Sequence, residues 1–187
     1  MTSSNAPSAE ASTVVTVLSD LASDGRTYIT AVQLDADTVR RLDRDQAYAW
    51  ARTALAAATR AEHDSLFMAQ MTQDLGAPLE TAGFHLAALR KERPPLDDAA
   101  TAPLRLGPGV NRDGVPFIAV FIKGTQVGQW TCADVRSHAT AVLEVAEAVD
   151  LDAAYYRYLT GFVGLDSATA RHTVAHLADH LPDGRQP

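Results

Sequence analysis

Residues 29–58, ITAVQLDADTVRRLDRDQAYAWARTALAAA, decide the fold, because residues 117–146, FIAVFIKGTQVGQWTCADVRSHATAVLEVA, follow the same pattern at an offset of 88. The register extends without a gap from Thr27–Pro94 to Val115–Pro182 and contains 14 identities in 68 pairs. A composition this rich in alanine would give about 5 identities by chance. The sequence therefore predicts an internal tandem duplication.

Each copy begins with short β-branched or aromatic stretches that predict a small antiparallel meander. Lys123-Gly124-Thr125 separates two of these stretches and favours a tight hairpin turn between residues 117–122 and 126–130. In the first copy, Asp35–Leu42 corresponds to the second of these two strands. It is more charged and fits either a strand or a helical turn. The other expected strands are Thr13–Leu18, Tyr28–Leu34 and Leu104–Leu106.

Helices are expected to follow each meander. In the first copy Asp43 or Asp45 can cap an alanine-rich helix over Gln46–Ala61. Ala51, Leu55 and Ala58 are identical in both copies and fall on one helical face, so we expect this face to be closely packed. The remaining expectations are two packed stripes (Phe67, Met71 and Leu75; Tyr155, Leu159 and Val163) and two third helices (about Pro78–Lys91 and about Asp166–His180).

The fold class that follows is α+β. Each half is expected to be a small antiparallel meander followed by two or three packed helices, and a pseudo-two-fold axis is expected to relate the halves, as in a homodimer fused into one chain. The expected segments are a disordered tail (1–12), a first repeat (13–93), a Pro/Ala/Asp connector (94–102), a second repeat (103–182) and a C-terminal tail (183–187).

The composition is that of a folded globular protein with an acidic balance. Of 187 residues, 47% are apolar and 21% charged, and the formal net charge is −7, so affinity for phosphate backbones is expected to be poor outside a local basic patch. No apolar run reaches the ~18 residues of a membrane span, and no signal peptide is expected. A single cysteine and 14 arginines against 2 lysines favour a bacterial cytoplasmic protein.

A helix–glycine–helix pattern recurs around Gly76 and Gly164. Apolar or small residues flank each glycine at offsets that resemble a helix-turn-helix, whose second helix enters the major groove of DNA. The same offsets arise wherever two helices pack at a glycine turn, so simple packing is the alternative explanation. Residues available to contact DNA or another partner are Arg90, Lys91, Arg93, Arg157, Ser167, Arg171 and His172.

Three histidines, His172, His176 and His180, share one face of the last expected helix. A pair such as His172 and His176, four residues apart, is a workable zinc chelate, although a weak candidate here. Three ligands on a straight helix spread over about 12 Å, so all three cannot reach one ion. We therefore expect a solvated face without metal, and no cofactor.

Residues for covalent or phosphate chemistry are scarce. Cys132 is expected at the start of a helix, where the thiol pKa can fall, but a buried and inert thiol is the preferred interpretation. Leu106–Val110 is rich in glycine but lacks the lysine and the following helix of a phosphate-binding loop, so we expect a turn there. No catalytic residue is assigned.

These patterns predict a non-enzymatic cytoplasmic binding or regulatory protein that acts through protein–protein contacts. The alternative is a DNA-binding transcriptional regulator that uses both helix–glycine–helix elements. An enzyme acting through His172, His176 or Cys132 ranks third, and a homo-oligomer is left open. Because the residues shared by both copies are those that a fold needs, we expect function to depend on residues that the copies do not share.

Overall fold

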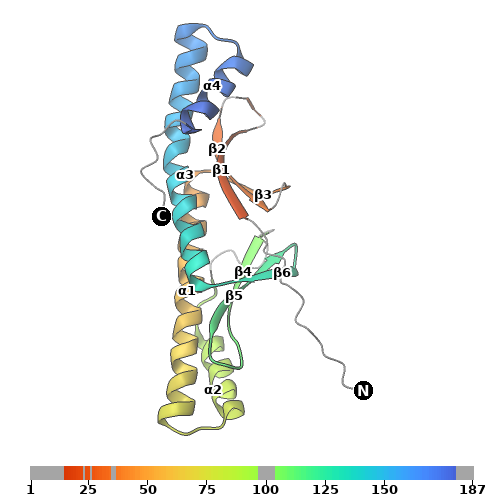
Figure 1. Cartoon of the computed structure of the whole chain (residues 1–187), viewed down its shortest axis with the longest axis vertical. Coiled ribbons are helices and arrows are strands. Elements are labelled where there is room, and N and C mark those ends of the chain that lie inside the picture. The colour runs from red at the N-terminus through yellow and green to blue at the C-terminus, as the bar shows by residue number, and fades with distance from the viewer. Residues whose placement is uncertain (1–14, 23, 26, 35–36, 97–103, 180–187) are drawn as a thin grey trace.

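The computed structural model describes residues 15–179 except 23, 26, 35–36 and 97–103. The α+β class is confirmed: the described residues form two three-stranded antiparallel sheets and four α-helices (Figure 1). The expected tails lie outside the described residues, as does most of the connector. The elements are β1 (Val15–Leu21), β2 (Tyr28–Leu34), β3 (Asp37–Leu42), α1 (Arg44–Ala69), a π-helical turn η1 (Gln70–Asp74), α2 (Leu79–Glu92), β4 (Leu104–Val110), β5 (Pro116–Ile122), β6 (Thr125–Trp130), α3 (Cys132–Tyr158), a second π-helical turn η2 (Leu159–Val163) and α4 (Ser167–Asp179).

Both halves have the same order of elements, strand–strand–strand–helix–π-turn–helix. Each sheet carries one irregularity, between Val32 and Gln33 in β2 and between Val120 and Phe121 in β5, which are positions 88 residues apart. For residues 35–42 the sequence allowed either a strand or a helical turn. Asp37–Leu42 form strand β3. The hairpin predicted between β5 and β6 is present, with Lys123 and Gly124 at positive φ, as a tight turn of this kind requires.

A side chain caps the N-terminus of each long helix, and the cap of α1 is one of the two predicted residues. Asp43 caps α1 and Thr131 caps α3, and in both cases the third residue of the helix returns a side-chain hydrogen bond to the cap. Gly76, which follows η1, and Gly164, which ends η2, adopt positive φ, a conformation that other residues adopt only with strain. The second helix of each half can therefore turn back along the first.

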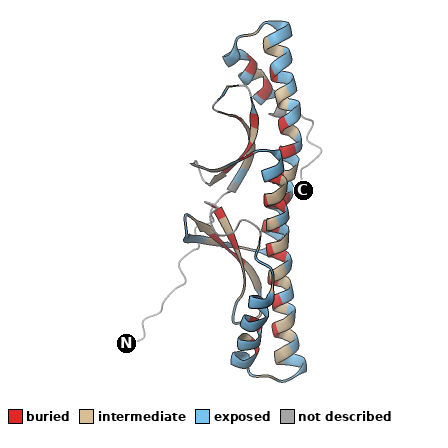
Figure 2. Cartoon of the chain, turned by 180° about the vertical axis from the view of Figure 1, so that it is seen from behind, coloured by how far each residue is buried: buried red, intermediate tan, exposed pale blue. Residues whose placement is uncertain are grey.

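The sheets and the long helices are exchanged between the halves. Strands β1 and β2 pack mainly on α3, whereas β4 and β5 pack mainly on α1, so each sheet covers the helix of the other half (Figure 1). From the sequence, each sheet was expected to pack with the helices that follow it. Instead, α1 and α3 lie side by side in one helical layer, and both sheets cover the same side of this layer (Figure 2).

Small residues bring the two long helices together. Ala51, Ala58, Ala139 and Ala146 are fully buried between the helices and the sheets, which confirms the close approach expected of this face. Leu55, expected on the same packed face, is instead 38% exposed.

Ion pairs connect the antiparallel helices α1 and α3 near both ends of their contact. Arg136 near the start of α3 donates two hydrogen bonds of 2.5 and 2.6 Å to Glu62 near the end of α1. Arg44 at the start of α1 binds Asp150 at 2.6 Å and Glu147 at 3.0 Å, late in α3. Such exposed pairs contribute little stability, but they favour one register of the two helices.

Residues 106–110 are a strand and not the expected turn. Gly107 and Gly109 lie within β4, and side chains of the neighbouring strand cover both of them. A Cβ atom on Gly107 would lie 3.0 Å from the Phe121 ring, and one on Gly109 would overlap the Phe117 ring. The glycines are therefore needed for the packing of aromatic rings across the sheet, and not for a bend in the chain.

Candidate functional site

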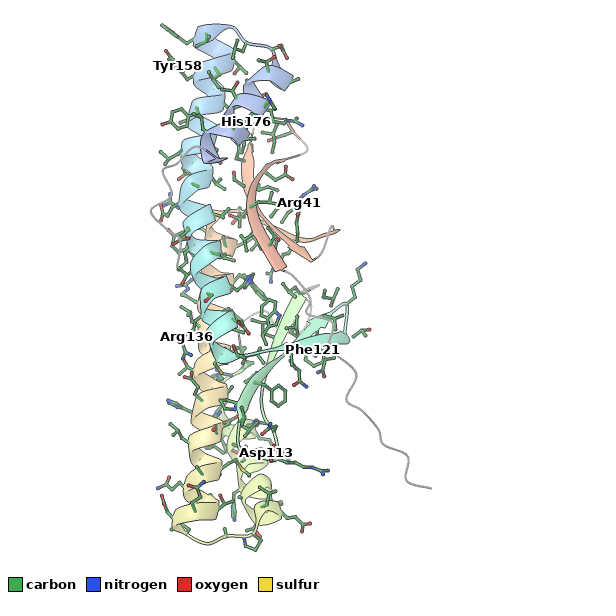
Figure 3. The ribbon with its side chains drawn as sticks, in the orientation of Figure 1. Arg41, Asp113, Phe121, Arg136, Tyr158 and His176 are labelled. Atoms are coloured by element: carbon green, nitrogen blue, oxygen red, sulfur yellow. The ribbon has the colours of Figure 1, made fainter. Side chains whose placement is uncertain are left out.

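Four large apolar side chains form an exposed line along the end of α3 and into η2. Leu151, Tyr155, Tyr158 and Phe162 are 61%, 51%, 54% and 80% exposed, respectively. Their spacing of four, three and four residues places them on one helical face, as in the contact seam of a coiled coil. We call this set the aromatic stripe. Figure 3 shows Tyr158 at the end of the molecule, turned away from the sheets.

The opposite face of the same helix holds the aromatic stripe in place. Val149 and Tyr156 are buried in a cluster with Leu21 and Tyr28 of the first sheet and with residues of α4. The hydroxyls of Tyr156 and Ser167 are 2.6 Å apart, which ties α3 to the start of α4. Because one side of α3 is fixed in this way, the stripe is presented on a rigid support.

Two aromatic residues of the stripe already contact each other. The rings of Tyr158 and Phe162 are stacked, with centroids 5.2 Å apart and planes inclined by 18°. Aromatic side chains lose little conformational entropy when they are buried by a partner, and they are enriched at protein interfaces. A preformed pair lowers this cost further.

The surroundings of the aromatic stripe are acidic. Residues 144–167 contain five acidic side chains and one basic side chain, Arg157. Thr169 hydrogen-bonds to Asp166 through its hydroxyl and its backbone, and these bonds lower the pKa of that carboxyl group, which therefore stays ionised at neutral pH. The segment that carries the stripe therefore has an acidic balance of charge.

The first half has no equivalent of the aromatic stripe. The residues 88 positions earlier are His63, Phe67, Gln70 and Asp74, and only Phe67 is apolar and is half-buried. The stripe is therefore confined to the second half among the described residues.

Part of this region was predicted to lie in the core, and that prediction is wrong. Tyr155 and Val163 were expected in a packed stripe, but they are 51% and 49% exposed. Leu75 in the first half is likewise exposed, at 68%. The cause is architectural: the first sheet and α4 cover only the opposite face of α3, where Tyr156 is buried. At both ends of the molecule the long helices also extend beyond the sheets (Figure 1). The spacing of Leu151, Tyr155, Tyr158 and Phe162 was the available signal.

Two of the three basic residues proposed for DNA contact at the end of α2 bind an acidic side chain of α1. Arg90 lies 2.7 Å from one carboxylate oxygen of Asp64, and Arg93 lies 2.5 Å from the other. The Asp64 side chain is only 1% exposed, so these arginines neutralise a buried charge. Lys91, between them in the chain, is exposed.

The remaining proposed contact residues lie at the other end of the molecule. Arg157 on α3 and Arg171 and His172 on α4 are exposed, whereas the hydroxyl of Ser167 is occupied by Tyr156. Helices α2 and α4 each bury one narrow face, through Ala82 and Leu86 and through Ala170 and Val174 respectively (Figure 2). The two groups of candidate residues do not form one surface.

The two candidate zinc ligands, His172 and His176, lie next to each other on α4. The rings of His172 and His176 are 4.2 Å apart on the exposed side of α4. Within the described part of the chain, no group of three His, Cys, Asp or Glu residues could hold a metal ion. His180 lies outside the described residues. The expectation of a solvated face without metal stays a prediction, and the weak candidate pair supplies two ligands.

Cys132 is the first residue of α3 and is buried. Its sulfur lies 3.7 Å from the carbonyl oxygen of Ala58. Burial raises the pKa of the thiol, and the negative charge of Glu62 acts in the same direction. The position at a helix N-terminus therefore does not yield a thiolate at neutral pH.

Cys132 is accordingly expected to react slowly in the folded protein. With an aromatic disulfide reagent at pH 7.5, we expect labelling at least about 100-fold slower than in the denatured chain, because the sulfur must first become exposed. The rate of absorbance change, with and without denaturant, measures this. Equal rates would show that Cys132 is accessible.

The first sheet, which packs against α3, contains a group of buried hydroxyls. The hydroxyls of Ser19, Tyr28 and Thr30 are buried without a hydrogen-bond partner among the described residues. Burial, followed by the charge of Asp152, raises the pKa of Tyr28, so this phenol is neutral and not a base at physiological pH. The second half has Gly107, Pro116 and Ile118 at these positions.

Comparison with known proteins gives no further guide. No protein family, curated protein or solved structure matches the chain significantly. Among the described residues, no helix combines the length and the apolar character needed to cross a membrane.

Proposed function

We propose that this protein is a non-enzymatic, cytoplasmic binding protein that acts through protein–protein contacts made by the aromatic stripe. The exposure of Leu151, Tyr155, Tyr158 and Phe162 carries the proposal. Contiguous exposed apolar side chains are costly to maintain in a soluble protein and commonly mark a surface that a partner covers. Aromatic side chains at the centre of such a surface supply most of the binding free energy.

The internal duplication and its pseudo-two-fold axis belong to the same proposal. Trp50 and His138 occupy equivalent positions in the 88-residue register, and Trp50 Nε1 donates a hydrogen bond of 3.1 Å to His138 Nε2. In a symmetric dimer, a residue that contacts its own equivalent lies on the two-fold axis. We place the pseudo-axis between these rings, with the exchanged sheets on either side.

The DNA-binding alternative has less support. Arg90 and Arg93 bind Asp64, Ser167 binds Tyr156, and the candidate residues lie at opposite ends of the molecule. A DNA reader needs several phosphate contacts near its base contacts. No arrangement of this kind is found among the described residues.

Site-specific crosslinking tests the proposed function. A photoreactive phenylalanine analogue placed at Tyr158 in the full chain is expected to form light-dependent crosslinks to protein in the cells of origin. The same analogue at Gln70, the exposed equivalent in the first half, is the matched control. Crosslinks from Tyr158 that exceed those from Gln70 support the proposal. Equal yields from both positions would overturn it.

A further inference from the structure

The spacing of the aromatic stripe and the charge around it indicate which kind of partner covers it. Its four side chains repeat at four, three and four residues, which is the period at which one α-helix contacts another in a coiled coil. From Leu151 to Phe162 the stripe spans about 16 Å, at 1.5 Å per residue, or three helical turns. A partner helix of about 12 to 15 residues with apolar side chains at the same spacing would cover it.

Charge selects among partners that have such a helix. Between residues 144 and 167 there are acidic residues at 144, 147, 150, 152 and 166, and one basic residue, Arg157. Arg44 binds Glu147 and Asp150, and the charges of Asp152 and Arg171 both act on Tyr28. Three arginines (Arg44, Arg157 and Arg171) thus stand against five acidic residues, and the balance of charge is negative. A helix whose apolar seam is flanked by lysine or arginine is attracted by this field, and an acidic helix is repelled.

The same field disfavours the other occupants. A second copy would bring the same acidic residues together in a chain of net charge −7, and like charges across an interface oppose association. Phosphates of nucleic acids and anionic lipid headgroups are repelled in the same way. A basic protein segment is thus the chemistry that fits.

We infer that the aromatic stripe binds a basic amphipathic helix of a partner protein, with apolar residues at four- and three-residue spacing against Leu151, Tyr155, Tyr158 and Phe162. This inference rests on the proposed function and specifies its partner. The apolar seam supplies affinity, and the acidic surroundings select the sign of the partner charge.

Two synthetic peptides test the inference with the full chain. Both are about 15 residues long, end-capped and labelled with a fluorophore, and carry leucines at the four- and three-residue spacing. One has lysines at the flanking positions and the other has glutamates. Fluorescence anisotropy is expected to show binding of the lysine peptide with a Kd at least about tenfold lower than that of the glutamate peptide, and with weakening at higher salt.

Paired substitutions locate the binding. Replacement of Tyr158 and Phe162 by serine is expected to raise the Kd of the lysine peptide at least about tenfold, because both side chains lie in the seam. The matched control replaces Gln70 and Asp74, their equivalents in the first half, by serine and should change the Kd less than about twofold. Circular dichroism of both variants checks that the helices remain folded.

Three results would overturn the inference. The first is equal binding of both peptides, and the second is unchanged binding by the Tyr158→Ser/Phe162→Ser variant. The third is a dimer in light scattering that this variant abolishes, which would identify a second copy as the occupant. If the peptide test fails while Tyr158 still crosslinks to another protein, the proposed function stands and only the partner chemistry is wrong. If neither succeeds, both are wrong.

Discussion

Replacing Arg90 and Arg93 together by alanine should lower the free energy of unfolding by about 3 to 5 kcal/mol, because Asp64 would remain as an unpaired charge in the interior. The Asp64 side chain is 1% exposed, and one arginine lies against each of its carboxylate oxygens. Urea denaturation followed by circular dichroism measures the change, with the slope of the transition expected to stay constant.

A third substitution separates the buried charge from the loss of arginine packing. Adding Asp64→Asn to the double variant removes the charge and should restore a large part of the lost stability, since a neutral amide costs less to bury than a carboxylate. If the double variant loses less than about 1 kcal/mol, or if Asp64→Asn restores nothing, the ion pairs do not hold α2 on α1.

Acidification from pH 7 to pH 4 should cost about 3 kcal/mol of stability through His138 alone. Burial lowers the pKa of His138 from 6.5 to about 4 in the folded protein. Between these values the unfolded chain binds a proton that the folded protein does not, so the stability is fully present above pH 6.5 and is lost as the pH falls toward 4. The size follows from about 1.4 kcal/mol per pKa unit.

The His138→Phe variant isolates this effect from other titrating groups. It should be less stable at pH 7 by about 1 to 3 kcal/mol, because the indole N–H of Trp50 loses its acceptor. Its stability should then fall less steeply between pH 6.5 and 4 than that of the unmodified protein. Urea titrations at several pH values give the difference. Parallel curves for the two proteins would mean that His138 titrates normally.

Local signals in the sequence predicted the elements well. The capping aspartate, Asp43, and the hairpin turn at Lys123 and Gly124 behave as their residue types require. Each depends on neighbours a few residues away, so the sequence contains the necessary information. The extended course of β4 was missed because it depends on Phe117 and Phe121 of the next strand, which cover Gly107 and Gly109.

Long-range contacts explain the other differences. The exchange of sheets between the halves depends on which helix each sheet meets, and an 88-residue repeat is compatible with either pairing. Tyr155 and Val163 were assigned to the core because apolar residues at helical spacing are usually buried. Only the three-dimensional structure reveals that the first sheet and α4 cover one face of α3 and that the helix extends beyond the sheets, so that Tyr155 and Tyr158 stay exposed.

The exchanged packing of the sheets has a consequence for synthesis of the chain. Strands β1 and β2 are covered by α3, whose buried residues extend to Tyr156. At typical translation rates of about 5 to 20 residues per second, the first sheet leaves the ribosome several seconds before its covering helix. During that interval its apolar face is open to solvent and to other chains. The first sheet therefore gains its native cover only after α3 has been synthesised.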